Sequence, residues 1–455
     1  MKRTQILIFI LSTIAMLALL CSVFPNGELK AGAITLRFPS VTEVLSGAEP
    51  EPERLSPEEL LELRHQAALD AEGDRYEEFF ASDPARFYLP DGDLHFFDSL
   101  FAALDSARTT PLRIVHYGDS QIEEDRITAT IRSALQSRFG GDGQGMLPLR
   151  RYFTPAMAVS GDVEPEHIMV YAERPEGLRK FGPYGDFVRL DTTARFTFYP
   201  VRKRGNGQLH FNRLTVLAGN SDGSLTVRCN GVSQRISTGS AIDRMVFELP
   251  DSSSRASITL SGSGDVYGVL LDDATGVRMD NVAMRGCSGL IFTLMHSEQL
   301  RSFYRDENVR LILLQYGGNT VPYLNKDKAI SNYAASVRRQ IAHLRGLAPD
   351  ATFIFIGPSD MSTTVKGKRQ TYPHLPALVD SLRTAANEAG AAYWDLYGAM
   401  GGSGSMVDWV GSTPPLAGSD YVHFTPRGSV RVGEMFNDSF LLYYDWYLWR
   451  KKNNL

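Results

Sequence analysis

The chain has 455 residues, too many for one ordinary hydrophobic core, so its length predicts two or three domains. Hydrophobic residues make up 43% of it and charged residues 22%, as in typical globular proteins. The net charge of −5 gives no electrostatic case for binding nucleic acid, and we exclude that class of partner.

The chain begins with a basic segment followed by an apolar one, a pattern that predicts export. Met1-Lys2-Arg3 precede an uncharged, mostly apolar run from Ile6 to Phe24, and Ala31-Gly32-Ala33 is a candidate cleavage site. We expect residues 1–33 to be a signal peptide or signal anchor, with the body of the protein in the periplasm or outer cell envelope. The apolar run is nearly long enough to span a bilayer, so cleavage and a membrane tether through residues 6–24 both stay open.

The segments that follow are predicted to connect this leader to the first domain. Residues 34–60 are rich in Pro, Glu and Ser and are typical of a linker. A charged helical stretch begins at Pro57. Residues 93–107 carry apolar side chains at helical spacing and predict an amphipathic helix that packs on the domain after it.

A strand, a turn and a helix are predicted around residue 120. Ile114 and Val115 belong to a short apolar run that is typical of a buried strand, and the run ends at Gly118-Asp119-Ser120. Apolar residues then recur at every fourth position, which predicts a helix: Ile127, Ile131, Leu135 and Phe139. This order places Ser120 at the carboxyl edge of a sheet, where open α/β folds build their sites.

From about residue 160 to residue 280 the pattern changes to short β-type runs separated by Gly, Asn, Ser and Asp turns. Alternating runs at roughly ten-residue intervals predict a β-sandwich. The runs are 194–199, 212–217, 224–228, 245–249, 256–260 and 266–271.

The α/β pattern resumes from Asn308. Strand-like runs at 310–316, 352–356 and 391–396 alternate with apolar residues at helical spacing. Such repeated units predict a parallel sheet with helices on both faces. The fold class is therefore α/β, with a β-sandwich inserted into it.

The cysteines are few and show no metal-binding spacing. Cys21 lies in the leader, so one pair, Cys229 and Cys287, remains for the body, and a bridge between them stays open. Without a CxxC or Cys/His cluster we expect no metal and no organic cofactor.

Three of the predicted loops carry polar residues of the kinds that take part in catalysis. Ser120 could act as a nucleophile if a base removes its proton, and His423 is a suitable base near neutral pH. Asp420, three residues earlier, could fold back to fix the tautomer of His423. Asn319 offers a side-chain N–H to a developing oxyanion.

In this order, Gly118-Asp119-Ser120, Gly317-x-Asn319 and Asp420-x-x-His423 resemble the motifs of the SGNH (GDSL-type) hydrolase family. The resemblance implies a three-layer fold, a Ser120–His423–Asp420 triad and an oxyanion hole made by the Ser120 N–H, a glycine and Asn319. Gly286 is the candidate glycine, and Gly289 is the alternative. Hydrolase segments are then expected at 61–150, with leading helices, and at 286–455, with the inserted sandwich at 151–285.

The chain is most similar to bacterial peptidoglycan O-acetylesterases, which carry a carbohydrate-binding-like β module at the same place. The serine block and the run from Phe139 to Gly145 carry this likeness, although Gln121 stands where such enzymes often have His and Thr320 where they often have Asp or Glu. It implies an esterase acting on an acetylated glycan, with peptidoglycan favoured. An O-acyltransferase with the same triad and a non-catalytic glycan-binding protein stay open, as do the acyl group and the oligomeric state.

Other notable side chains have simpler interpretations. We expect His116 to be a hydrogen-bonded core residue and the aromatic tail 440–449 to be a closing helix. Aromatic residues of the insert could stack on sugars, but the core is the commoner place for them: Phe181, Tyr184, Phe187 and Tyr267.

Overall fold

The computed structural model describes residues 3–23, 28–31, 34–37, 73–170, 180–201, 209–237, 241–251 and 253–455. Contacts divide the chain into two units, Met1–Glu77 and Glu78–Leu455, which we describe separately. Most of the expected linker and the helical stretch that begins at Pro57 lie outside the described residues.

The first unit contains a helix and a small hairpin. Helix α1 (Arg3–Val23) covers most of the apolar run, and strands β1 (Glu28–Ala31) and β2 (Ile34–Arg37) pair antiparallel. Strand β2 thus occupies the start of the segment that we expected to be a linker. Across the parts of the chain with described positions, no helix combines the length and apolar character needed to cross a membrane.

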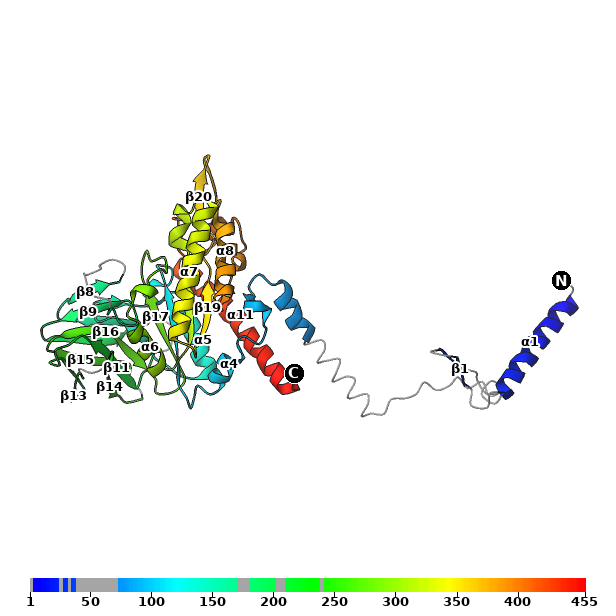
Figure 1. Ribbon diagram of the computed structural model, residues 1–455, viewed down its shortest axis with the longest axis horizontal. Coiled ribbons are helices and arrows are strands. Elements are labelled where there is room, and N and C mark those ends of the chain that lie inside the picture. Colours follow the sequence, from blue (N-terminus) through cyan, green and yellow to red (C-terminus); the bar gives the residue numbers. More distant parts are fainter. Residues whose placement is uncertain are drawn as a thin grey trace. The chain divides into compact units, whose positions relative to one another are not determined.

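The second unit is built on a six-stranded sheet (Figure 1). Its strand order is β17 (Val277–Ala283), β4 (Leu112–Gly118), β18 (Val309–Gln315), β19 (Thr352–Ile356), β22 (Ala392–Trp394) and β3 (Phe87–Tyr88). All neighbours are parallel except the edge strand β3, which pairs antiparallel with β22. The predicted parallel sheet is therefore confirmed.

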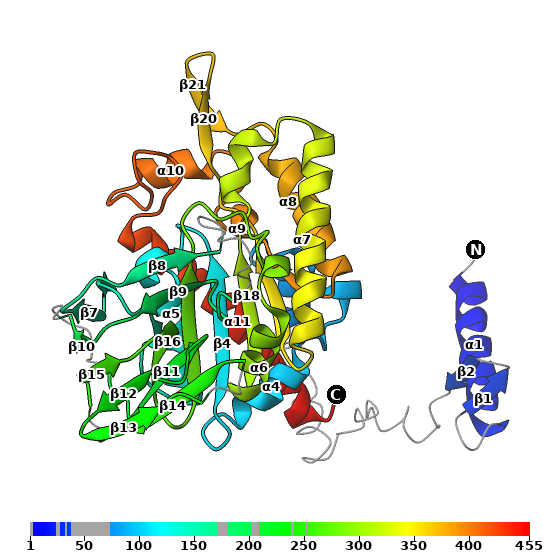
Figure 2. The ribbon, with the colours of Figure 1, turned by 60° about the vertical axis from the view of Figure 1, so that its left-hand side comes forward.

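Helices cover both faces of this sheet, so the fold has three layers (Figure 2). Alternate residues of β4 face opposite sides: Val115 packs in one buried cluster and Ile114 in the other. The first cluster includes residues of α6 (Ser297–Asp306), α7 (Asp327–Leu347) and α8 (Leu375–Glu388). The second includes residues of α4 (Asp98–Asp105), α5 (Thr128–Phe139) and α11 (Pro426–Asn453).

The observed helices can be compared with the helical segments that the sequence predicts. The predicted stripe from Ile127 to Phe139 is buried, and α5 carries most of it. Helix α4 is shorter than the expected 93–107, because hydrogen-bonded turns occupy the residues before Asp98. The aromatic tail forms part of α11, and its Phe440, Tyr443 and Tyr444 are buried in the core, as expected for a closing helix.

The β-rich segment forms two antiparallel sheets around a core of their own. One sheet contains β13 (Val232–Arg235), β12 (Thr226–Cys229), β15 (Ala256–Ser261), β10 (Ala194–Pro200), β7 (Met157–Gly161) and β6 (Tyr152–Phe153). The other contains β14 (Asp243–Glu248), β11 (Arg213–Gly219), β16 (Gly264–Asp272), β9 (Asp186–Leu190) and β8 (Glu166–Met169), with β5 (Gly145–Leu147) paired to β16. Each of the six predicted runs overlaps one of these strands, and three of the runs extend one or two residues beyond their strand: 212–217, 224–228 and 245–249.

The strands change the expected limits of the insert, 151–285. Strand β5 already pairs within the sandwich, and β17 belongs to the parallel sheet beside β4. The sandwich strands therefore run from Gly145 to Asp272, and the parallel sheet resumes at Val277. The sequence pattern hid β17 because polar residues interrupt its apolar positions: Asp280 and Asn281 are buried and hydrogen-bonded inside the protein.

The insert packs against the α/β part through the outer face of its second sheet. Tyr184, Phe187 and Tyr267 are buried in the same cluster as α6 and α7, and Phe181 joins them. These four aromatic residues are therefore core residues, and they are not free to stack on a sugar.

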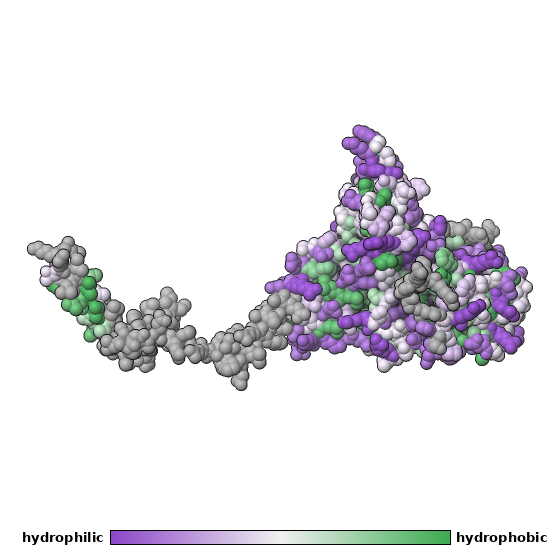
Figure 3. Space-filling model, turned by 180° about the vertical axis from the view of Figure 1, so that it is seen from behind, coloured by the Kyte–Doolittle hydropathy of each residue, from purple (hydrophilic) through white to green (hydrophobic). Residues whose placement is uncertain are grey.

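The remaining elements lie beyond the sheet. They include the hairpin of β20 (Ser362–Val365) and β21 (Lys368–Thr371) and the short helices α9 (Leu396–Ala399) and α10 (Ser405–Gly411). A helix at 73–82 spans the division between the two units. The hairpin projects from the unit, and its surface is largely hydrophilic (Figure 3).

Candidate active site

Ser120 lies two residues after the end of β4, half-buried at the carboxyl edge of the sheet. Gly118 is required here by close contacts, because a Cβ would lie 2.8 Å from the Ile122 side chain and 3.2 Å from the Gln315 carbonyl. The helix after Ser120 starts within one residue of Ile127, the first position of the predicted stripe. A short 3₁₀ segment, Glu123–Asp125, comes first, and α5 begins at Thr128.

His423 and Asp420 lie in the loop that leads into α11. The Asp420 carboxylate lies 2.7 Å from His423 Nδ1, and its other oxygen accepts the backbone N–H groups of Val422 and His423 at 3.0 and 3.1 Å. Partial burial opposes ionisation of Asp420, but the hydrogen bonds from His423 and the two backbone groups outweigh it and lower the pKa of Asp420. The carboxylate is thus ionised and accepts the Nδ1 proton.

The histidine also reaches the serine. His423 Nε2 lies 2.9 Å from Ser120 Oγ. With the proton of neutral His423 held on Nδ1 by Asp420, Nε2 is free to accept the hydroxyl proton. The structure therefore brings together the three residues that the sequence predicted, across 303 positions of the chain.

Asn319 lies beside this chain of hydrogen bonds, in the segment after β18. Its side-chain nitrogen donates to the Asp119 carboxylate at 2.8 Å and to the Cys287 carbonyl at 3.1 Å. Both amide hydrogens of Asn319 thus have acceptors, and an oxyanion would have to replace one of them.

Asp119 is a site residue to which the sequence analysis gave no role. It is 3% exposed and accepts hydrogen bonds from the Gln121 backbone at 3.0 Å and from Asn319. Burial raises the pKa of Asp119 to about 6, although these hydrogen bonds and the nearby His423 lower it. Its position directly before the serine was the available signal, since a buried acid at a strand end needs hydrogen-bond donors.

The two candidate glycines differ in their surroundings. Gly286 is exposed on the loop after β17, with φ of +76° and open space where a Cβ would be. Gly289 packs against the Tyr316 ring, and its N–H points to the Cys287 thiol at 3.4 Å. Gly286 therefore has the freer backbone, and its place in the oxyanion hole stays a prediction.

The structure also answers two other questions raised by the sequence, on a disulfide bridge and on the role of His116. Cys229 and Cys287 are free and lie in different buried clusters, so no bridge joins them. His116 is fully buried, with Nδ1 2.9 Å from the Thr128 hydroxyl and Nε2 3.2 Å from the Gln315 amide oxygen. Burial lowers the pKa of His116 to about 3, as expected of a core histidine.

Comparisons with known proteins agree with this fold. Residues 252–431 match the model of the GDSL-like lipase/acylhydrolase family. This range contains Asn319, Asp420 and His423, while Ser120 lies before it, on the other side of most of the insert. No curated protein sequence matches the chain.

Solved structures match over more of the chain. A structure titled as a peptidoglycan O-acetylesterase in action is 20% identical and has a TM-score of 0.62, covering 78% of this chain and 97% of its own. A carbohydrate esterase family 2 enzyme with a carbohydrate-binding domain from Corynascus thermopiles is 12% identical, with a TM-score of 0.29, covering 62% of this chain and 100% of its own. A salicylyl-acyltransferase from a tetracycline biosynthetic pathway is 12% identical, with a TM-score of 0.27, covering 64% and 94%.

The first of these structures shares the fold, and the low scores of the other two support no structural argument. The family match covers the segment that carries Asn319, Asp420 and His423, and the sheet adds the serine block to them. Residues 252–431 are thus similar to the GDSL-like lipase/acylhydrolase family, and the second unit shares the fold of a peptidoglycan O-acetylesterase structure.

Proposed function

We propose that this protein is an exported serine esterase that removes O-acetyl groups from a cell-envelope glycan, with peptidoglycan the favoured substrate. The observation that carries the proposal is the continuous hydrogen-bond chain from Ser120 through His423 to Asp420. An ordinary serine hydroxyl is a poor nucleophile, and this arrangement gives it a base whose tautomer is fixed.

In the proposed reaction, Ser120 Oγ attacks the ester carbonyl while His423 Nε2 takes its proton. The imidazolium that forms is stabilised by the ionised Asp420, and it then gives its proton to the leaving sugar hydroxyl. The result is an acetyl group on Ser120. Water, deprotonated by His423, attacks this acyl group and releases acetate, which returns the serine to its starting state.

The tetrahedral intermediates carry a negative oxygen that needs donors. We assign this role to the backbone N–H groups of Ser120 and Gly286 and to the Asn319 side chain. Asn319 would exchange its 3.1 Å hydrogen bond to the Cys287 carbonyl for one to the oxyanion and keep the shorter one to Asp119. Asp119 thus holds the amide in place while its other hydrogen is used.

The substrate class rests on two supports. The structure with a TM-score of 0.62 is titled as a peptidoglycan O-acetylesterase, and its match extends over 78% of this chain. The basic and apolar leader is typical of an exported protein, which would meet such a glycan.

The experiment that tests the proposal has two parts. The native chain and Ser120→Ala are compared for release of p-nitrophenol from p-nitrophenyl acetate, and we expect hydrolysis by the native chain alone. Isolated cell-wall fragments are then weighed by mass spectrometry before and after treatment. Loss of one acetyl group per modified sugar supports deacetylation, whereas equal rates for the two proteins rule out the proposed nucleophile.

A further inference from the structure

A two-stranded hairpin, residues 362–371, follows β19 and projects at the sheet edge that carries Ser120 (Figure 2). Its strands β20 and β21 pair antiparallel and are joined by Lys366 and Gly367, whose φ angles are +51° and +79°. Two successive positive φ angles are typical of a type I′ turn, the kind that suits the twist of a short hairpin. Asparagine and glycine adopt such angles more readily than lysine does, so the turn itself does not require a lysine.

The base of this hairpin contacts the loop that holds Asp420 and His423. The backbone N–H of Ser362 donates a hydrogen bond to the carbonyl of Tyr421 at 3.2 Å. The guanidinium carbon of Arg369 lies 4.2 Å from the centre of the Tyr421 ring, which is a cation–π distance. Tyr421 directly follows Asp420 in the chain. A molecule bound along the hairpin would therefore extend to the loop that positions the base.

The hairpin carries positive charge and no negative charge. Lys366, Lys368 and Arg369 are exposed, and residues 362–371 include no Asp or Glu. Among the residues that the structure describes, no carboxylate forms an ion pair with these three cations. Since the chain as a whole has a net charge of −5, the hairpin is a local reversal of sign. A projecting group of cations without carboxylate partners attracts anionic ligands.

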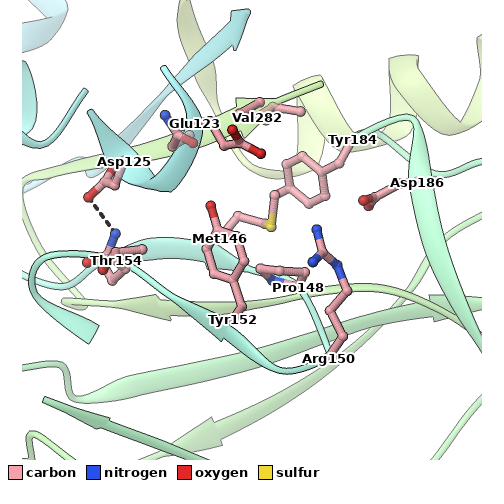
Figure 4. A pocket seen from close by; sticks show the side chains of 13 residues that line it. Glu123, Asp125, Met146, Pro148, Arg150, Tyr152, Thr154, Tyr184, Asp186 and Val282 are labelled. Atoms are coloured by element: carbon pink, nitrogen blue, oxygen red, sulfur yellow. Dashed lines mark hydrogen bonds between the residues drawn. The ribbon is translucent and has the colours of Figure 1, made fainter. Parts of the chain in front are cut away.

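On the other side of Ser120, two neighbouring cations are already paired. Strand β17 flanks β4 on that side, whereas β19, which leads into the hairpin, lies beyond β18 on the opposite side. Arg285 pairs with Glu123, and Arg132 pairs with Asp125 at 2.7 Å. Both carboxylates line a small pocket next to β17 (Figure 4). An anionic group near the serine is therefore favoured on the hairpin side.

A carboxylated glycan fits the hairpin better than an anionic membrane does. Segments that bind a membrane surface usually add Trp, Phe or Leu side chains that enter the lipid. Val365 is the one apolar residue at positions 363–370, and it is half-buried. The contact with the Tyr421 loop instead connects the hairpin to the place where the substrate reacts.

We propose that this hairpin is a docking surface for carboxylate groups of the glycan substrate. Each strand has four residues, which places Lys366 about 14 Å from the contacts at the base. The two lysines therefore meet units of the glycan that neighbour the acetylated sugar, while that sugar lies at Ser120. The inference rests on the proposed function, because it names the charge of the same substrate.

The test measures binding of a hyaluronan hexasaccharide, a glycan with a carboxylate on every second sugar, to the full chain by calorimetry. We expect binding that weakens from low salt to about 150 mM salt, and weaker binding of the neutral N-acetylchitohexaose. Lys366→Asn with Lys368→Gln removes two charges and suits the positive φ at position 366, and it should weaken hyaluronan binding about tenfold, the combined effect of two exposed ion pairs. Arg195→Gln with Arg228→Gln is the matched control, since both arginines are exposed on the insert and neither has an ion pair within the described chain. The control should bind as the native chain does.

Equal affinities of the lysine and arginine variants, or equal binding of the two oligosaccharides, overturn the docking surface. Binding to vesicles of phosphatidylglycerol without binding to hyaluronan also overturns it, in favour of a membrane. Hydrolysis of p-nitrophenyl acetate is measured on the same proteins. If the lysine variant loses hydrolysis as strongly as binding, the hairpin only supports the catalytic loop and the proposal falls. Hyaluronan binding by a native chain that cleaves no ester leaves the docking surface standing and removes the esterase proposal, whereas hydrolysis without hyaluronan binding removes the docking surface alone.

Discussion

The side-chain amide of Gln121 donates a hydrogen bond to the backbone carbonyl of Val422 at 2.8 Å. Gln121 follows the serine and Val422 precedes the histidine, so this contact joins two loops that are 301 positions apart in the chain. The peptidoglycan O-acetylesterases that the sequence resembles often have His at the position of Gln121. In this protein the glutamine N–H supplies a donor at that place.

We predict that Gln121→Leu lowers kcat for p-nitrophenyl acetate about tenfold, the cost of one hydrogen bond that positions the serine against its base. The KM should change little, because Gln121 is a positioning residue. Gln121→His should restore part of the rate, as an imidazole N–H can also donate. A native kcat for Gln121→Leu would show that the two loops keep their spacing without this contact.

Asp420→Asn should reduce kcat about 10³- to 10⁴-fold, because an amide at this place favours the wrong histidine tautomer. The lowered pKa of Asp420 adds a pH prediction: its ionised form persists as pH falls, so acid loss of activity in the native protein should reflect protonation of other groups. Rates between pH 4 and pH 8 for both proteins check this. A reduction of less than tenfold would contradict the orienting role.

Asp119 should make part of the stability depend on pH. Its pKa is raised from the ordinary 3.8 to about 6 in the folded state, so the folded chain binds this proton more tightly than the unfolded chain. The corresponding stabilisation is complete below about pH 4 and is lost as pH rises through about 6. Asp119→Asn removes this dependence, so the difference in unfolding free energy between variant and native chain should shift in favour of the variant from pH 4 to pH 7. Urea unfolding at both values checks this, and a constant difference would contradict it.

Arg113 connects the parallel sheet to the inserted sandwich through buried ion pairs. It is fully buried in β4 and pairs with Asp280 at 2.6 Å, with Glu307 at 3.0 Å and with Asp272. Arg113→Met would leave the buried Asp272 and Asp280 without this cation, although Glu307 keeps its ion pair with Arg244, so we expect a loss of about 3–5 kcal/mol in unfolding free energy. Exposed Arg305→Met is the control and should change it by less than about 0.5 kcal/mol. Similar effects for the two variants would contradict this role.

Much of the fold could be predicted because its elements have strong periodic patterns. The stripe from Ile127 to Phe139 and the runs before Gly317 and Gly357 were sufficient to predict helices and parallel strands. Strand β17 could not be found in this way, because Asp280 and Asn281 are buried and bonded to partners that only the folded chain brings near. The sandwich strands begin before residue 151, at Gly145, because β5 pairs with β16, a contact between residues distant in sequence.

The features of the site also divide into those that a local motif predicts and those that depend on tertiary contacts. Ser120, Asp420 and His423 are residue types with recognisable chemistry at motif spacing, and the folded chain connects them. The second hydrogen bond of Asn319, to the Cys287 carbonyl, depends on how the loop after β17 folds. The contact between the hairpin and Tyr421 depends on packing between segments distant in sequence, and no motif marks it.

The central claim is that the Ser120 hydroxyl is activated by His423, and covalent labelling tests it most directly. A fluorophosphonate ester is added to the native chain, to Ser120→Ala and to His423→Ala, and each protein is digested and analysed by mass spectrometry. The account predicts one adduct, on Ser120, in the native chain, with none at that site in Ser120→Ala and strongly slowed labelling in His423→Ala. An adduct on another residue, or equal labelling of Ser120 with and without His423, would contradict it.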